Sequence, residues 1–251
     1  DRRARFGQLA GQPGVGQALP DALAVAGARG EADSAAALVE DRLWHHARSS
    51  DQRLWFDRFA AGEIAAFGLT EPNHGSDATW METRAVRQDK DGQPGWLING
   101  AKMWTTGMHA ASHLMCFART SGKDGDAKGI TCFLVPTDDE GVQIEEYLWT
   151  FNMPTDHPRV SFKDVWVPET TIFGDPENGL PVAQAFVHEN RIRQAASSLG
   201  AAVFCIQESV AYARARKPFG EPLASNQAIQ FPLVELATQA EMLRLLIRKT
   251  E

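Results

Sequence analysis

The sequence predicts an α+β protein, in which N-terminal helices precede a central antiparallel β-barrel or sandwich and long C-terminal helices follow it. Three observations support this order. Helical spacing of apolar residues occurs early in the chain, short segments rich in β-branched and aromatic residues fill the middle, and two long stretches with few turn residues end it. The expected domains are residues 1–63, 64–172 and 173–251.

Two helices are expected in the N-terminal domain. The first covers residues 33–47, where leucine, valine and tryptophan recur at helical spacing. The second begins at the polar cap of residues 49–51 and stops at Gly62.

The middle domain alternates between short apolar segments and turn signals. An Asn-Gly pair between apolar segments is a strong hairpin signal, because both residues tolerate positive φ. We therefore expect Asn99-Gly100 to join two strands and KMWTTG to lie on the second of them. The expected strands are IAAFGL, TRAVRQ, WLI, AKMWTT, HLMCFART, GITCFLVP, VQIEEYL and VSFKDVWV.

The C-terminal domain is expected to consist of two long helices, at residues 183–216 and 226–249, joined by the turn KPFGEPL. The chain stops at Glu251 within a helical pattern that has no cap, so a fragment of a longer protein is expected.

The composition restricts the class of function. Hydrophobic residues make up 43% and charged residues 23%, which is typical of a globular chain. A net charge of −7 argues against a broad surface for nucleic acid or for an anionic membrane. No apolar stretch approaches the ~20 residues that span a bilayer. The expected location is therefore the cytoplasm, or the mitochondrial matrix if the source is eukaryotic.

The three cysteines indicate neither a disulfide framework nor a metal site. They are odd in number, widely spaced and set among apolar neighbours, as in LMCFA and ITCFL. We expect Cys116, Cys132 and Cys205 to be buried, inert thiols.

The run GLTEPNHGSD, residues 68–77, has three interpretations. A catalytic triad needs side chains that converge from distant parts of the chain, which neighbouring residues do not do. The run could be a polar turn with no further role. Alternatively it could be an anion-binding loop, in which Gly75 lets the backbone approach a ligand and Ser76 adds a hydroxyl donor.

Two further stretches also allow a structural or a functional interpretation. Trp104 could be an ordinary core residue, or it could join Thr106 on one strand face to pack on a flat heteroaromatic ring and bond its edge. Arg216, Phe219 and Gln227 could be a charged helix end, or they could present an arginine to phosphate and an aromatic ring to a base.

Together these stretches resemble the acyl-CoA dehydrogenase family of flavoproteins. LTEPNHGSD is similar to the family's first motif, INGAKMWTTG to its second, VSFKDVWVPE to the strand that closes its β domain and ARKPFGEPLASNQAIQ to its Arg-x-x-Phe-Gly motif. The resemblance covers residues 50–251. Residues 153–162 are most similar to the branch of the large eukaryotic acyl-CoA dehydrogenases ten and eleven.

The resemblance implies an N-terminal helical domain, a β-barrel domain and a C-terminal four-helix bundle that is incomplete here, with FAD as the cofactor. It implies that Trp104 packs on the flavin ring and that Thr106 reaches the ring's N5 edge. By the same resemblance, Arg216, Phe219 and Gln227 would contact the FAD of a neighbouring subunit, so a homodimer or homotetramer is expected. The implied FAD-binding residues are Phe67, Leu69, Thr70, Gly75, Ser76, Trp104, Thr105, Thr106, Arg216, Phe219 and Gln227.

The reaction implied by the resemblance is α,β-dehydrogenation of an acyl-CoA thioester to the trans-2-enoyl-CoA, as in the β-oxidation of fatty acids. Electrons would pass to an electron-transfer flavoprotein. A flavin monooxygenase or oxidase on the same fold and a non-catalytic flavin-binding module are the alternatives. No metal is expected.

The catalytic base is not identified. The family's commonest base position lies beyond Glu251, and its alternative position matches Asn190, which cannot act as a base. Glu189 is a candidate, but a step of one residue rotates a side chain by ~100° around a helix. The resemblance places Ser76, Asn190 and Arg191 along the substrate channel. His74 stands where many relatives have a small residue.

Overall fold

The computed structural model describes residues 57–58, 63–150 and 156–250. The helix predicted for residues 33–47 lies outside them, and of the second predicted helix only Asp57 and Arg58 are described, both helical. The chain divides into two compact units. We call the described residues up to Phe186 the β unit and those from Val187 onward the helical unit.

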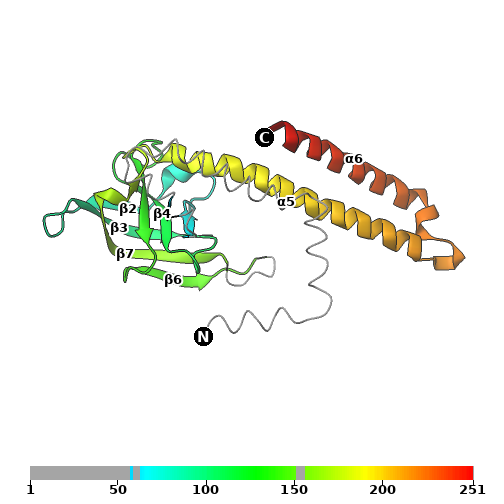
Figure 1. Ribbon diagram of the computed structural model, residues 1–251, viewed down its shortest axis with the longest axis horizontal. Coiled ribbons are helices and arrows are strands. Elements are labelled where there is room, and N and C mark those ends of the chain that lie inside the picture. The colour runs from blue at the N-terminus through cyan, green and yellow to red at the C-terminus, as the bar shows by residue number, and fades with distance from the viewer. Residues whose placement is uncertain (1–56, 59–62, 151–155, 251) are drawn as a thin grey trace. The chain divides into compact units, whose positions relative to one another are not determined.

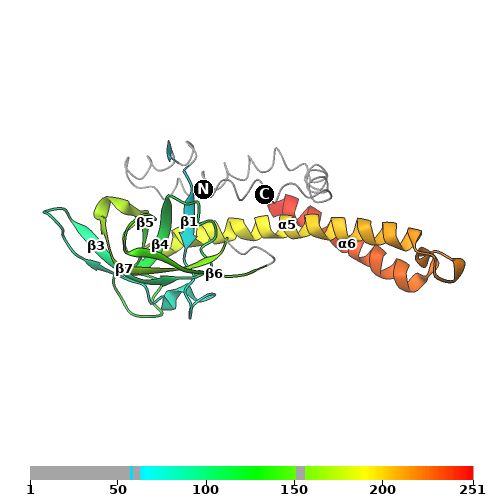
Figure 2. The same cartoon turned by 90° about the horizontal axis from the view of Figure 1, so that it is seen from below.

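The β unit contains one mixed sheet of eight strands in the order β6-β7-β3-β2-β4-β5-β8, with β1 paired to β4 (Figures 1 and 2). Short 3-10 turns η1 (Ala78–Trp80) and η2 (Glu169–Thr171) lie between strands. The strands are β1 (Ala65–Gly68), β2 (Arg84–Arg87), β3 (Gly95–Lys102), β4 (His113–Arg119), β5 (Ile130–Pro136), β6 (Val142–Tyr147), β7 (Pro158–Pro168) and β8 (Ile172–Phe173).

Strand β4 lies at the centre of this sheet, and all of its residues are buried. Strand β5 pairs antiparallel along one edge of β4, while β1 and the end of β2 pair parallel along the other. Continuous apolar runs such as HLMCFA are typical of strands covered on both faces. The predicted β domain followed by helices is confirmed, but the sheet is mixed rather than purely antiparallel.

The hairpin predicted at Asn99-Gly100 is wrong. Strand β3 runs without interruption through both residues, and its pairing with β7 shifts register between Ile98 and Gly100. Asn99 donates from Nδ2 to Asp164 Oδ1 over 3.1 Å, and Asp164 donates from its backbone N–H to Asn99 Oδ1 over 2.9 Å. Gly100 has φ +147°. The pair therefore makes an irregularity within a strand instead of a turn between two.

Gly100→Ala is expected to destabilise the protein by about 2–4 kcal/mol, since it adds both overpacking and backbone strain. An added Cβ would lie 2.6 Å from Thr83 Oγ1 and 2.7 Å from Thr83 Cα. Urea unfolding measures the loss. Gly92→Ala is the matched control, because Gly92 also has positive φ but has no atom within 4 Å of an added Cβ. Equal losses in the two variants would contradict the steric argument.

Burial separates the three cysteines. Cys116 and Cys132 lie on β4 and β5 and are buried, and burial raises the pKa of the Cys116 thiol to about 11 and that of Cys132 well above its usual value. Cys205 is exposed, so its predicted burial is wrong. Its apolar neighbours in VFCI belong to a helix with only a few buried positions.

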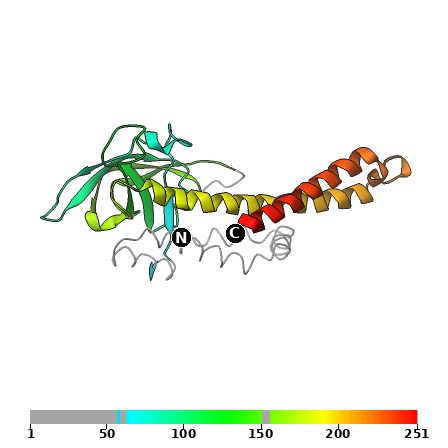
Figure 3. The ribbon, with the colours of Figure 1, turned by 90° about the horizontal axis from the view of Figure 1, so that it is seen from above.

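The helical unit consists of two helices that run side by side as a hairpin (Figure 3). Helix α5 spans Leu180–Ala215, beginning in the β unit, and α6 spans Gln227–Thr250, with the short turns η3 (Pro218–Gly220) and η4 (Leu223–Ser225) between them. Leu199, Ala240 and Ile247 form the buried contact between the two helices. Both predicted helices are confirmed. Among the described residues, no helix has the length and apolar character needed to cross a membrane.

Candidate functional site

The loop that follows β1 is a compact turn closed by its own backbone. The Glu71 N–H donates to the His74 carbonyl over 3.0 Å, and the His74 N–H donates back to the Glu71 carbonyl over 3.2 Å. Gly75 and Ser76 follow this turn and are exposed. Within the part of the chain that the structure describes, no hydrogen bond uses the N–H of Gly75 or of Ser76. These donors are therefore available to an anionic ligand.

A buried ion pair lies beneath the loop. Lys102, the last residue of β3, donates to Glu71 Oε1 over 2.7 Å, and the two side chains are 0% and 2% exposed. Glu71 also accepts from the backbone N–H groups of Glu82 and, over 3.0 Å, of Thr83. Every part of this carboxylate is satisfied by a charge or a hydrogen bond, which is the condition for burying it.

The environment of Glu71 keeps it ionised. Burial alone would raise the pKa of the carboxyl, but the charge and hydrogen bond of Lys102, together with the bonds from Thr83 and Glu82, outweigh burial and lower the pKa. Lys102 also reaches the carbonyl of Leu69 over 3.4 Å. Lys102 thus joins the start of the loop after β1 to the end of β3, and Glu71 joins it to the residues just before β2.

After Lys102, the remaining residues of KMWTTG form a turn rather than a strand. Trp104 has φ +62° and is 47% exposed. The predicted arrangement of Trp104 and Thr106 on one strand face is therefore wrong, because β3 ends at Lys102. The Met103 N–H donates to the Thr70 carbonyl over 2.8 Å, so this turn and the loop after β1 are hydrogen-bonded neighbours.

The far side of the Trp104 turn is fixed to the start of β7. Thr105 is buried and donates from both its N–H and its Oγ1 to the carbonyl of Pro158, over 3.2 and 2.8 Å. Thr106 Oγ1 lies 2.9 Å from Nδ1 of His157. Sequence reasoning did not single out His157, because its 51-residue separation from Thr106 hides their contact.

His74 has a defined partner in the structure. Its Nε2 lies 3.2 Å from Glu82 Oε1, the same atom that accepts from Asn73 Nδ2 over 3.0 Å. The Glu82 carboxylate therefore binds the side chains at the tip of the loop, while the backbone N–H of Glu82 donates to the buried Glu71 carboxylate. His74 thus helps to hold the loop in place through Glu82.

Phe67 and Leu69 pack against an apolar cluster of the β unit. The Phe67 ring stacks on Phe186 with 4.1 Å between centroids and also contacts Phe117 at 5.2 Å. Both predicted positions therefore contribute to the wall that supports the loop, with the side chains only partly buried.

The remaining predicted FAD-binding residues belong to the helical unit. Arg216 follows α5 and is exposed, and its carbonyl accepts from the Leu223 N–H over 2.9 Å. Phe219 is fully exposed and has φ +58°, so its ring points into solvent from a backbone conformation that phenylalanine rarely adopts. Gln227 is the first residue of α6 and is exposed.

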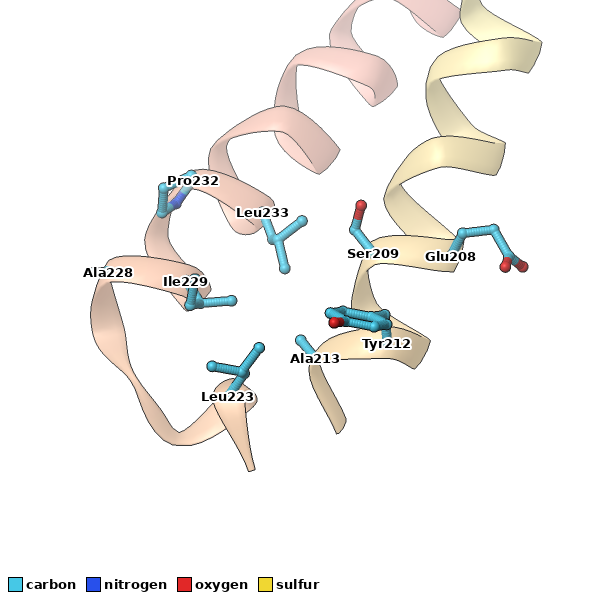
Figure 4. A pocket seen from close by; sticks show the side chains of 9 residues that line it. All are labelled: Glu208, Ser209, Tyr212, Ala213, Leu223, Ala228, Ile229, Pro232 and Leu233. Atoms are coloured by element: carbon cyan, nitrogen blue, oxygen red, sulfur yellow. The ribbon is translucent and has the colours of Figure 1, made fainter. Parts of the chain in front are cut away.

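An open apolar pocket of about 610 Å³ lies between α5 and α6 next to this turn. Figure 4 shows Tyr212, Leu223, Ile229 and Leu233 around the hollow, while the Glu208 carboxylate points away from it. The other lining residues are Ser209, Ala213, Ala228 and Pro232.

The predicted substrate residues on α5 lie at the start of the helical unit. Glu189 is buried and forms an ion pair with Arg193 over 3.3 Å, one helical turn later. Asn190 is half-buried, and Arg191 is exposed with Nη1 3.0 Å from His188 Nδ1. Glu189 is thus engaged with a cation.

Two family models match the chain. One, described as the middle domain of acyl-CoA dehydrogenases, matches residues 66–165, and the other, the C-terminal domain of the same enzymes, matches residues 177–250. Together they cover most of the sequence and all of the predicted site residues.

Individual relatives agree with these models. A probable acyl-CoA dehydrogenase of Bacillus subtilis is 32% identical over 219 residues, which is 86% of this chain and 56% of that protein. The mitochondrial short-chain specific acyl-CoA dehydrogenase of Rattus norvegicus is 35% identical, over 79% of this chain and 47% of its own length. The chain therefore spans about half the length of the curated relatives it matches.

Solved structures show the same fold. The butyryl-CoA dehydrogenase of Megasphaera elsdenii matches with a TM-score of 0.74 and 30% identity, over 84% of this chain and 54% of that one. A glutaryl-CoA dehydrogenase of Mycobacterium smegmatis in complex with FADH2 matches with a TM-score of 0.70 and 28% identity, over 83% of this chain and 52% of that one.

Proposed function

The chain belongs to the acyl-CoA dehydrogenase family, and from this premise we propose that its protein catalyses the FAD-dependent α,β-dehydrogenation of an acyl-CoA thioester to the trans-2-enoyl-CoA. The observation that carries the proposal is the contact between two motifs distant in sequence. The loop after β1 and the Trp104 turn are joined by the Thr70–Met103 hydrogen bond and by the Glu71–Lys102 ion pair.

The donor set of the β unit fits a flavin nucleotide. The exposed N–H groups of Gly75 and Ser76 and the Ser76 hydroxyl suit an anionic group. Trp104 is 47% exposed, and the exposed Thr106 stands two residues further along the same turn. We assign Phe67, Leu69, Thr70, Gly75, Ser76, Trp104, Thr105 and Thr106 to FAD binding.

When bound, FAD accepts the hydride that leaves the β-carbon of the substrate. The protein's part is to hold the thioester carbonyl, to remove the α-proton and to exclude water. In this proposal Ser76, Asn190 and Arg191 line the substrate channel. Glu189 would have to leave its ion pair with Arg193 to act as a base.

The proposal extends to assembly and to an electron-transfer partner. The helical unit exposes many large apolar side chains, among them Phe231, Val234 and Leu245, each more than half exposed. Extended apolar surface of this kind is typical of protein–protein contact. We therefore propose that the protein forms a homodimer or homotetramer. Family membership further supports an electron-transfer flavoprotein as the electron acceptor, and the cytoplasm, or the mitochondrial matrix of a eukaryote, as the location.

Anaerobic titration of the complete FAD-loaded protein with acyl-CoAs of several chain lengths tests the proposed reaction. At least one thioester is expected to bleach the visible absorbance of the flavin and to yield the enoyl-CoA, while the free fatty acid of the same length leaves the spectrum unchanged. Bound FAD that no acyl-CoA bleaches would identify a flavin-binding module instead. In a parallel reaction of the reduced protein with air, a product oxygenated by O2 would identify a monooxygenase.

A further inference from the structure

The contact between Thr106 and His157 is held by rigid backbone on both sides. Thr106 Oγ1 and His157 Nδ1 are 2.9 Å apart, and the His157 side chain is 17% exposed. The Gly107 N–H donates to the Asp156 carbonyl over 3.0 Å, and Thr105 donates twice to Pro158. The residues before and after each partner are therefore hydrogen-bonded across the same gap.

This contact decides what the Thr106 hydroxyl offers to a ligand. A hydroxyl has one proton to donate and two lone pairs, and an imidazole nitrogen is either a donor or an acceptor. If His157 Nδ1 carries a proton, it donates to Oγ1, and the hydroxyl proton of Thr106 is left for an outside acceptor or for the Trp104 carbonyl, which lies 3.5 Å from Oγ1. If Nδ1 is bare, the hydroxyl donates to it, and Oγ1 can accept from an outside donor.

A carboxylate lies beside the His157 ring. Asp156 Oδ2 is 3.8 Å from His157 Nδ1. His109 faces the other oxygen of the same carboxylate, with Nδ1 3.9 Å from Asp156 Oδ1. The Asp156 carboxylate therefore faces both histidines and does not confine His157 to one tautomer.

We propose that His157 is a positioning residue that acts through Thr106, switching the Thr106 hydroxyl between donor and acceptor toward the flavin. This rests on the proposed function. A flavin nitrogen that accepts a hydrogen bond in the oxidised state carries a hydrogen in the reduced state. When a hydroxyl exchanges its donor role for an acceptor role toward the flavin, it keeps a matched bond to its other partner if that partner changes role as well, and the two tautomers of an imidazole supply that change.

The test is a double-mutant cycle on the midpoint potential of FAD bound to the complete protein. In the wild-type background, His157→Phe is expected to change the relative affinity for the two flavin states about tenfold, or about 30 mV for a two-electron couple. In the Thr106→Val background it is expected to change nothing more. His157→Asn is expected to stay near the wild-type potential, because an amide both donates and accepts.

Equal shifts from His157→Phe in both backgrounds, or no shift in either, would overturn the proposal. A second measurement needs no substitution: 15N NMR is expected to show His157 Nδ1 protonated with oxidised flavin and bare with reduced flavin. The same tautomer in both states would also overturn it. A wild-type protein that binds no FAD refutes the proposed function. If acyl-CoA bleaches the bound FAD but the effects of the two substitutions on the midpoint potential are additive, only this inference is refuted.

Discussion

Lys102→Met is expected to destabilise the protein by about 3–5 kcal/mol at neutral pH, because it leaves the buried Glu71 carboxylate without its cation. The Glu71 side chain is 2% exposed, so water cannot replace the lost ammonium group. The backbone N–H groups of Glu82 and Thr83 would still bond the carboxylate but would not neutralise it. Urea unfolding measures the loss.

The pH dependence of this variant follows from the pKa of Glu71. In the wild type that pKa is lowered, so the pair contributes stability above the pKa of an unfolded glutamate and loses it as pH falls through the lower folded value. In Lys102→Met, burial is the largest remaining influence on Glu71 and raises the pKa of its carboxyl in the folded state. A carboxyl whose folded-state pKa lies above its unfolded-state pKa lowers stability at neutral pH, and this loss disappears as the pH falls and the carboxyl takes up a proton. The deficit is therefore expected to be smaller in mild acid than at neutral pH.

Arg87→Met is the control for Lys102→Met. Arg87 and Glu169 form an ion pair of 3.1 Å, but their side chains are 54% and 43% exposed. Removing an exposed pair costs about 0–1 kcal/mol. A loss in Lys102→Met no larger than in this control would show that the buried pair does not stabilise the loop.

Arg216→Ala is expected to weaken FAD binding about 10- to 100-fold, because a hydrogen bond to a charged group is worth about 1.5–3 kcal/mol. The residue is exposed at the end of α5, where an arginine can meet a phosphate without disturbing a core. Flavin fluorescence gives the affinity, and sedimentation gives the state of assembly. If FAD is bound between subunits, both measurements are expected to fall together.

Arg214→Ala provides the matched control for Arg216→Ala. Arg214 lies in the last turn of the same helix and is also exposed. The two substitutions remove the same charge from neighbouring positions, so only a specific contact distinguishes them. Equal FAD affinity in both variants would contradict the assignment of Arg216 to the cofactor.

The secondary structure was predictable where hydrophobic periodicity dominates. The long helices α5 and α6 and the apolar strands β4 and β5 follow directly from their sequence patterns, because each needs only local information. Asn99-Gly100 failed for a reason outside the local sequence. Asp164, 65 residues away, bonds the Asn99 side chain and keeps the pair inside a strand.

The site was predictable as motifs but not as geometry. The two motif stretches were identified from their residues, yet Trp104 lies in a turn with positive φ, which a strand pattern cannot reveal. Glu71 and Lys102 were each visible in the sequence, one in each motif. Their pairing depends on β1 and β3 ending beside each other. Without that information, a lysine at the end of a strand is expected to be exposed to solvent.

Strand β6 affects whether the edge of the sheet can pair with a strand of another molecule. Among the described residues it ends the hydrogen-bonded order of the sheet, and its pairing with β7 shifts register between Ile144 and Glu146. Glu145 and Glu146 place two exposed carboxylates at this irregularity, of which Glu145 is paired with Arg159 on β7 over 2.9 Å. An exposed strand that is bent and charged is a poor template for the strand of another molecule. The end of the sheet is thereby protected against edge-to-edge aggregation.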